Sequence, residues 1–431
     1  MSWPRRIHWQ AEALRLRRQP LAWWALGALF LVLLACAVSA GLDARAWRAS
    51  AAGDAAVFDE KLAQASAQFD KAAAPGQARA NATYQLGRGD LGATRMPVDA
   101  GLALGVQRLA ALPVRVNASL DSPHVDARDP GPLRNPLLTD SGLPGLPAMA
   151  ALLIALVALV LSAGLLQEER EQGRMGLLRV QSRHGLAPIL AAALGWRLLA
   201  LWAVAVLATL PALLLDPGAN AWVLLQWAGA LAAFCAAWVL LGGLLSRAPI
   251  SGAASMLAAL GIWLALTFAL PAGLVLLAQK KAPLPSRLEF IVALRAAQHA
   301  AEDNEQPLAQ AWYEEHPEIA AQLPAVWPAS FVPRVLDQDL ALEPWTVEFS
   351  EARAEQARIV AQWSWLSPGL ALVLFGERLA GTDAARHGRY LQQVEAFEQR
   401  WRDFLVPAVM DREGLRPDQL RELPRFAPRD F

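Results

Sequence analysis

The hydrophobic positions of this chain fall into long uninterrupted runs rather than into the short alternations of a soluble fold. A bilayer core about 30 Å thick needs roughly 20 apolar residues in helical conformation. Five runs meet that requirement, and they occupy residues 20–41, 147–166, 198–215, 221–245 and 252–278. The pattern predicts an all-α polytopic membrane protein with five clear transmembrane helices. For the first run we favour an uncleaved anchor over a secretory signal, because the run is long and no clean cleavage site closes it.

Two long polar regions lie between and after these runs. Residues 42–146 begin with helical periodicity over 54–74 and later alternate around 112–120, which predicts a mainly helical region with some β structure. Residues 279–431 show mainly helical periodicity. By alternation of the spans we expect both regions to be extracytoplasmic.

Arginine positions orient the runs, because short loops rich in lysine and arginine stay in the cytoplasm. Residues 1–19 and the loop 167–197 are both rich in arginine, and alternation places them on the same side. The N-terminus is therefore predicted to be cytoplasmic. Residues 1–19 also alternate bulky apolar residues with arginines, which favours an amphipathic helix on the inner leaflet, with a basic anchor that only sets topology as the alternative. The expected membrane-interface anchors are Arg15, Arg17, Arg18, Trp23, Trp24 and Arg197.

A further apolar run at 363–380 is ambiguous. It is shorter than a span, contains Pro368, and carries Glu377 and Arg378 near its end. These features favour an interfacial helix over a sixth crossing.

The composition and the absence of motifs mainly exclude classes of function. The chain is 55% hydrophobic and 18% charged, with a formal net charge of zero, so no global field recruits nucleic acid. No histidine pair has metal-ligand spacing, and neither a phosphate-binding loop nor a serine nucleophile pattern is present. We therefore predict no catalytic residue, no metal and no cofactor in this chain. Any energy that drives its function must come from a partner protein.

The most informative motif follows the second run. Acidic residues at the exit of a span, then a glycine that lets the chain turn, then a short amphipathic stretch are typical of a docking element. A solvated charged loop is the alternative. The residues that would carry docking are Glu168, Glu169, Arg170, Glu171, Gly173, Arg174, Arg179 and Arg183.

This motif carries a family resemblance. Glu169-Arg170-Glu171-Gln172-Gly173 resembles the signature that follows the second span in permeases of the ABC-2 class, although Arg174-Met175 replace its usual Thr-Leu. The stretches Leu366-Ser367-Pro368 and Leu379 to Asp383 resemble the tail of a subgroup with an uncharacterised C-terminal extracytoplasmic domain, labelled multicopper-enzyme-maturation or gliding-type permeases. Asn135-Pro136-Leu137 also fits that subgroup.

The resemblance implies a permease with six spans in a bacterial inner membrane, paired with a second permease subunit as a homodimer or heterodimer. Two ABC ATPase subunits, which hold ATP and Mg, would dock under the loop 167–197, and residues 1–19 would form an elbow helix. Relatives end with one more span after a Pro-x-Phe element, here Pro424-Arg425-Phe426. Either that final span is missing from this chain or 363–380 is the sixth span.

Two classes of function follow. The resemblance implies the permease subunit of an ATP-driven exporter of an unidentified substrate, in contact with membrane lipid and not with nucleic acid. The alternative is a membrane-anchored scaffold, sensor or maturation factor that acts through its extracytoplasmic regions. The spans are generic leucine, alanine and valine surfaces, so they leave the substrate open.

Overall fold

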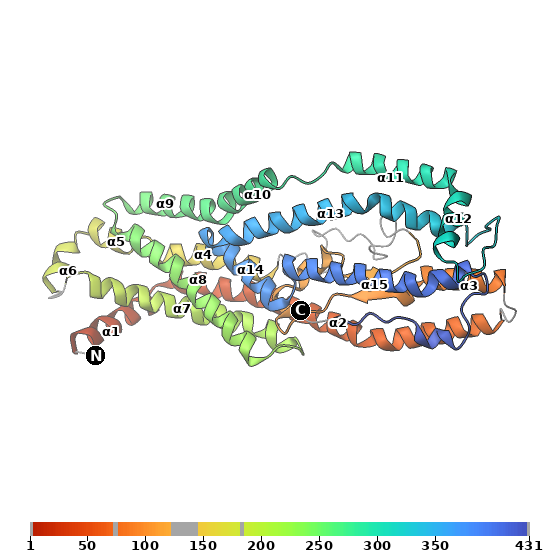
Figure 1. The fold of residues 1–431 in the computed structure, drawn as a ribbon. Coiled ribbons are helices and arrows are strands. Elements are labelled where there is room, and N and C mark those ends of the chain that lie inside the picture. The colour runs from red at the N-terminus through yellow and green to blue at the C-terminus, as the bar shows by residue number, and fades with distance from the viewer. Residues whose placement is uncertain (1–2, 72–75, 122–144, 182–184, 429–431) are drawn as a thin grey trace.

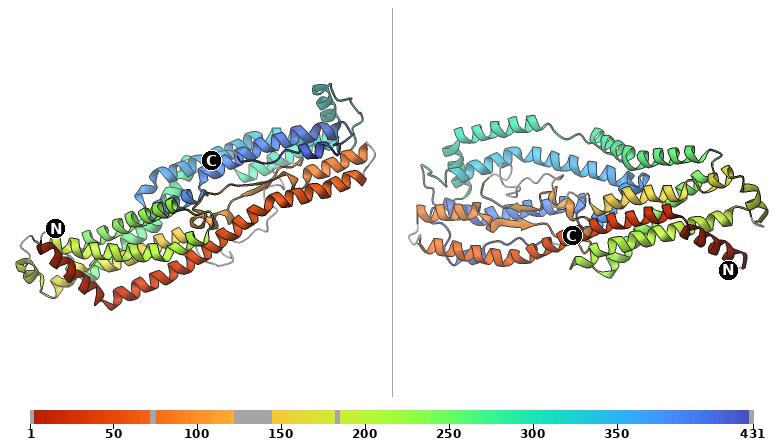
Figure 2. Two further views of the ribbon diagram at one scale, coloured as in Figure 1. Left: turned by 90° about the horizontal axis from the view of Figure 1, so that it is seen from below. Right: turned by 180° about the vertical axis from the view of Figure 1, so that it is seen from behind.

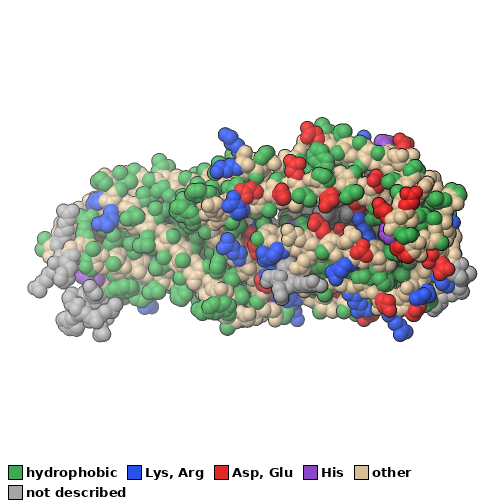
Figure 3. Space-filling view, in the orientation of Figure 1, with side chains coloured by type: hydrophobic (Ala, Val, Ile, Leu, Met, Phe, Trp, Pro, Cys, Tyr) green, Lys and Arg blue, Asp and Glu red, His purple; other side chains and the backbone are tan. Residues whose placement is uncertain are grey.

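The computed structural model describes residues 3–71, 76–121, 145–181 and 185–428. The molecule is elongated, with long helices running roughly along one axis (Figures 1 and 2). Figure 3 shows hydrophobic side chains covering one half and charged side chains gathered on the other. We call these halves the span bundle, which holds the apolar helices, and the polar lobe, which holds the rest.

Five stretches of helix are long and apolar enough to cross a membrane, which confirms the predicted all-α architecture with five such helices. Two are single helices, α7 (Ala187–Leu215) and α8 (Ala221–Arg247). A third is the first part of α2 (Pro20–Lys71). The fourth combines α4 (Leu146–Ser162) with α5 (Leu165–Glu171). The fifth joins α9 (Gly252–Leu264) to α10 (Leu270–Lys281) through a π-helical segment, Ala265–Ala269.

The helix α2 is much longer than the first apolar run. The run was expected to end at residue 41 and a separate helix to begin near 54, but one helix of 52 residues covers both. No proline interrupts the stretch after Pro20, so no local feature stops the helix. Gly41 lies against α7, where a Cβ atom would come within 2.8 Å of the Leu215 Cβ. The α2 helix therefore belongs to both halves of the molecule.

The helix α7 begins before the predicted span. Residues 187–197, which were expected to close the loop 167–197, form the first turns of α7 and continue without a break into the span. Pro188 lies in the first turn, where a missing N–H costs nothing, and no breaker separates this turn from the span. The connection between α5 and α7 is therefore shorter than expected.

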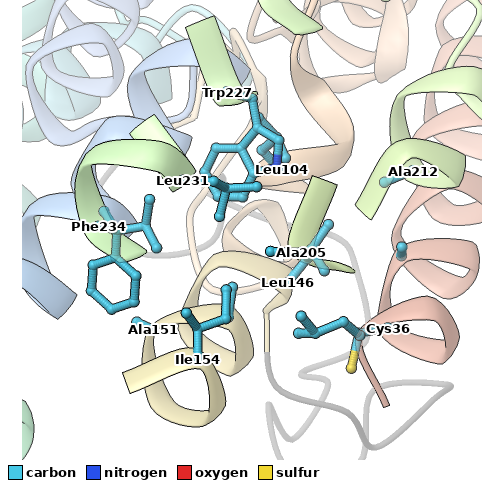
Figure 4. Packing of buried hydrophobic residues seen from close by; sticks show 14 of the residues in the cluster. Cys36, Leu104, Leu146, Ala151, Ile154, Ala205, Ala212, Trp227, Leu231 and Phe234 are labelled. Atoms are coloured by element: carbon cyan, nitrogen blue, oxygen red, sulfur yellow. The ribbon is translucent and has the colours of Figure 1, made fainter. Parts of the chain in front are cut away.

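The core of the span bundle combines the large side chains of α8 with alanines and leucines of α2, α4 and α7. Figure 4 shows Trp227, Leu231 and Phe234 of α8 facing residues of the other spans, which include Ala151 and Ala205. Small side chains let helices approach closely in a membrane. At Gly242 of α8 the approach is closest, since a Cβ atom there would overlap the Ser162 hydroxyl of α4.

The ambiguous run 363–380 is not one helix. The long helix α13 (Phe331–Trp363) ends at its start, a 3-10 turn covers Ser364–Leu366, and α14 (Pro368–Ala380) follows. At 13 residues, α14 is about 20 Å long, which is short of a crossing. It packs against α4 and α8 (Figure 1). Its N-cap, Ser367, accepts a bond from the Leu370 N–H and donates its hydroxyl to the Leu266 carbonyl of the π-helical segment, at 2.7 Å.

The polar lobe is mainly helical, with one two-stranded antiparallel sheet among its described residues. Strand β1 (Ala93–Arg95) pairs with β2 (Arg115–Asn117), so the alternation predicted around 112–120 gives a strand of three residues. The helices of the lobe are α3 (Gln77–Arg88), α11 (Arg287–Asp303), α12 (Glu305–Glu315), α13, α15 (Ala384–Met410) and the second half of α2. Short 3-10 turns cover Asp90–Gly92, Leu102–Leu104, Val106–Ala110 and Gln419–Glu422.

Candidate functional site

A cluster of charged residues lies at the end of the span bundle that carries α1 (Trp3–Arg17), α5 and α6 (Met175–Gln181) (Figure 1). The helix α1 packs against the first turns of α7. There the Trp196 indole donates a hydrogen bond to the Trp9 carbonyl at 2.8 Å, and the two rings meet edge to face. Gly195 makes room, since a Cβ atom would lie 2.6 Å from the Trp9 ring. This contact fixes α1 beside the spans.

Arg197 is buried, and its expected role as a membrane-interface anchor is wrong. Only 1% of its surface is exposed. Its guanidinium donates to the Leu161 carbonyl at 2.7 Å and to the Ala193 carbonyl at 3.0 Å. The reason is the early start of α7, which places Arg197 on the third turn of a helix and turned toward α4. Carbonyls near a helix C-terminus lack intrahelical partners, so Leu161 can accept from this cation.

The counter-ion of Arg197 is Glu12 on α1, with a separation of 3.8 Å between their nearest nitrogen and oxygen. Glu12 is 7% exposed, and its Oε2 atom has no hydrogen-bond donor. Burial raises the pKa of Glu12, against the opposing effect of the Arg15 and Arg197 guanidinium groups. Glu12 was not among the residues expected from the sequence. The available signal was Arg197 itself, because a cation close to an apolar run requires a partner.

Glu169 joins α1 to the turn between α5 and α6. Its carboxylate pairs with Arg15 at 2.7 Å and with Arg174 at 3.0 Å, and the carboxylate is nearly buried. Glu168 is more exposed and lies 3.5 Å from the same Arg15 group. Arg15 is therefore engaged by α5 rather than left to lipid headgroups.

The next two residues of the motif contact the loop between α8 and α9. Arg170 donates to the Ala248 carbonyl at 2.5 Å and to the Arg247 carbonyl at 3.1 Å. Glu171 accepts a bond from the Gly252 N–H at 2.7 Å, at the N-terminus of α9, where a negative charge is favourable. Four consecutive charged residues thus contact α1, the end of α8 and the start of α9.

The turn and α6 project from this cluster. Gly173 has a φ of 70°, the left-handed conformation that glycine adopts without strain. Leu177 and Val180 on α6 are exposed, Val180 by 84%. Arg179 lies on α6, although the structure does not describe its side chain, and Arg183 lies outside the described residues. Asn135-Pro136-Leu137 also lies outside them.

The remaining predicted anchors are on the surface. Arg17 and Arg18 are exposed at the end of α1, and Trp23 and Trp24 are exposed at the start of α2. The Trp23 indole donates to the Arg17 carbonyl at 3.1 Å. Among the described residues, no group of three histidine, cysteine or acidic side chains is arranged to hold a metal ion.

A second ionic cluster lies at the opposite end of the spans, and we call it the distal cluster. Asp216, at the end of α7, pairs with Arg48 of α2 and also accepts from the Gly218 N–H at 3.0 Å. Arg48 donates in addition to the Asp99 carbonyl at 2.6 Å, and the Asp99 carboxylate pairs with Arg386 of α15. The distal cluster therefore ties the span bundle to the polar lobe.

Comparisons with known proteins bear on the polar lobe alone. Residues 287–429, from α11 through α15 to the C-terminal segment, match the family described as a domain of unknown function (DUF3526). Searches of the curated proteins and of the solved structures found no match. The charged cluster around Glu12 and Glu169 lies outside the matched region.

Proposed function

We propose that this chain is the membrane-spanning permease subunit of an ATP-driven exporter of the ABC-2 type, with ATP and Mg held by a separate ATPase subunit. The observation that carries the proposal is the bonding of residues 168–171. Glu169 contacts α1, Arg170 the end of α8, and Glu171 the start of α9. A force applied to the turn after α5 reaches several span ends at once.

The docking surface for the ATPase is α6 with the turn before it. Leu177 and Val180 expose apolar surface beside charged residues, a combination suited to a protein partner. Two ATPase subunits, one for each permease subunit, would close on ATP and move this turn. Coupling of this kind is a rigid-body movement of packed helices between two arrangements.

A second permease subunit is part of the proposal, as a homodimer or a heterodimer. The fifth span is the least covered, with 6% of its apolar window buried, against 61% for the span formed by α4 and α5. Exposed apolar residues continue from this span onto α11, where Leu288 and Val292 are exposed. Lipid can cover a span, whereas α11 lies in the polar lobe and requires a protein to cover it.

This assignment places α5 and α6 on the cytoplasmic side of a bacterial inner membrane and α1 along its inner leaflet, where Arg17, Arg18, Trp23 and Trp24 meet membrane lipid. The polar lobe then lies outside the membrane, where it would meet the exported substrate or a further partner. This chain would hold no catalytic residue, and no nucleic acid would bind to it.

The test is a tagged pull-down from gently solubilised native membranes, with retained proteins identified by mass spectrometry. We expect a stoichiometric ATPase to be retained by the unaltered chain. Val180→Asp should abolish its retention, and the control Leu340→Asp, which alters an exposed apolar residue of α13, should not.

Charge reversal extends the test to coupling. Glu171→Lys removes the bond to the start of α9 and should leave ATP hydrolysis running without transport, while the spans stay inserted. Absence of any ATPase beside an intact chain would instead favour the scaffold, sensor or maturation factor. Full transport coupling in Glu171→Lys would reject residues 168–171 as the coupling element.

A further inference from the structure

A groove with mainly apolar walls runs between α5, α7 and α8 at the end of the bundle that carries the charged cluster. Its volume is about 530 Å³. The walls include Leu190 and Leu194 of α7 and Leu240 of α8. Within the described part of the chain, the groove is an open and mainly apolar space beside the charged cluster.

The length of the groove matches one leaflet of a bilayer. On α7 the lining runs from Ala187 to Leu198, and on α8 it runs from Ala236 to Arg247. Each stretch advances eleven residues along a helix, which is about 17 Å. Half of a hydrocarbon core about 30 Å thick is about 15 Å. The walls are therefore as long as the acyl layer of a single leaflet.

Two guanidinium groups stand at one end of the groove. Arg170 is held there by its bonds to the Ala248 and Arg247 carbonyls, and Arg247 is exposed on the last turn of α8. Among the residues that the structure describes, those lining the groove include no aspartate or glutamate. Of the carboxylates nearby on α5, Glu169 is paired with Arg15 and Arg174, and Glu171 is bonded to the Gly252 N–H.

We infer that this groove binds one anionic phospholipid, whose phosphate lies between Arg170 and Arg247 and whose acyl chain lies along α7 and α8. The charge of the occupant follows from two cations with no acidic residue in the lining, since guanidinium groups bind phosphate through paired hydrogen bonds. Basic pockets between membrane helices bind anionic headgroups by the same physics. This inference does not depend on the exporter proposal, because it needs no ATPase.

The experiment is native mass spectrometry of the full chain in mild detergent, titrated with phosphatidylglycerol or with phosphatidylcholine of the same acyl chains. We expect the anionic lipid to bind at least tenfold more tightly. Arg247→Gln should weaken its binding about fivefold, the factor that corresponds to about 1 kcal/mol for one surface cation. Arg358→Gln removes the same charge from an exposed position on α13, outside the groove, and should leave the affinity unchanged.

A second variant tests the apolar walls. Ala191 lines the groove and is exposed, so Ala191→Phe fills the space without removing a charge and should weaken binding of both lipids at least tenfold. Glycerol phosphate, which carries the headgroup charge without a chain, should compete only weakly.

Four results would overturn the inference. Equal affinity for the two lipids would show that the arginines do not select an anionic headgroup. Unchanged lipid affinity in Ala191→Phe would show that the lipid does not lie in the groove. Binding of glycerol phosphate as tight as that of the lipid would assign the site to a free phosphate. If Ala191→Phe dissociated a dimer instead, the occupant would be a second copy of the chain.

Discussion

The two ionic clusters at the ends of the spans differ in how completely the buried carboxylate at the centre of each is hydrogen-bonded. In the distal cluster, Asp216 accepts bonds from two nitrogens of Arg48 and from the Gly218 N–H. In the cluster around α1, Glu12 faces Arg197 at 3.8 Å and keeps one oxygen without a donor. The Asp216 carboxylate is thus held by three donor nitrogens, whereas Glu12 is a buried carboxylate whose charge is only partly compensated.

This difference predicts that one helix contact is rigid and that the other can rearrange. A fully bonded buried pair resists rearrangement, because every alternative arrangement leaves a charge unpaired. A partly bonded pair loses less stabilising free energy when its helices shift. We therefore expect the contact between α1 and α7 to open more readily than the contact between α2 and the end of α7.

The largest effect is expected at Arg197. Arg197→Met leaves Glu12 without its buried counter-ion and leaves the Leu161 carbonyl without a donor. Removing one partner of a buried pair costs about 3–5 kcal/mol. Thermal unfolding in detergent would measure the loss, with the exposed Arg17→Met as control. A loss no greater than that of the control would mean that Arg197 does not hold α1 in place.

A smaller loss is expected in the distal cluster. Asp216→Asn keeps the shape of the side chain but removes the charge that faces Arg48, which retains its bond to the Asp99 carbonyl. A hydrogen bond to a charged group contributes about 2 kcal/mol. The rates of backbone amide hydrogen exchange in α2 and in α15 should rise together. An increase confined to α2 would show that this cluster does not link the two halves.

Two glycines test the packing of α1 with a matched pair. Gly195→Ala places a methyl group against the Trp9 ring and should cost about 1 kcal/mol, because the ring must shift. Gly229→Ala, on α8 with open space around it, should stabilise by about the same amount through helix propensity. Limited proteolysis of α1 would report the first change. An equal change in stability in both variants would contradict a tight contact between Gly195 and the Trp9 ring.

The smallest effect concerns pH. Because burial raises the pKa of Glu12 in the folded protein, the folded state binds more protons than the unfolded state around that pKa. The contribution of Glu12 to stability is therefore fully present below its unfolded pKa and is lost as the pH rises through the folded pKa. We expect α1 to be better protected from exchange at pH 5 than at pH 7. In Glu12→Gln that pH dependence should disappear, and its persistence would assign it to another group.

The sequence predicted the existence of the spans better than their ends. Apolar runs are a local property, so five helices could be expected from hydropathy alone. The continuation of α2 to Lys71 and the start of α7 at Ala187 depend on the absence of a helix breaker, which hydropathy does not report.

The charged cluster was predictable only in part. The motif at 168–174 marked the right turn, because charged residues at the exit of a span are visible in one sequence. The pairing of Arg197 with Glu12 was not, since it joins two helices far apart in the chain. Likewise, local capping chemistry explains why Ser367 begins α14, but its bond to the Leu266 carbonyl depends on tertiary packing.

The length of α2 has a mechanical consequence. Its 52 residues correspond to a rod about 78 Å long, more than twice the thickness of a bilayer core. One part of the rod lies among the spans, and its far end lies in the polar lobe (Figure 2). A tilt of about 5° around one end would displace the other by about 7 Å over that length. A displacement of ångström scale among the spans is therefore amplified at the far tip, and Arg48, which pairs with Asp216, lies near the middle of the rod.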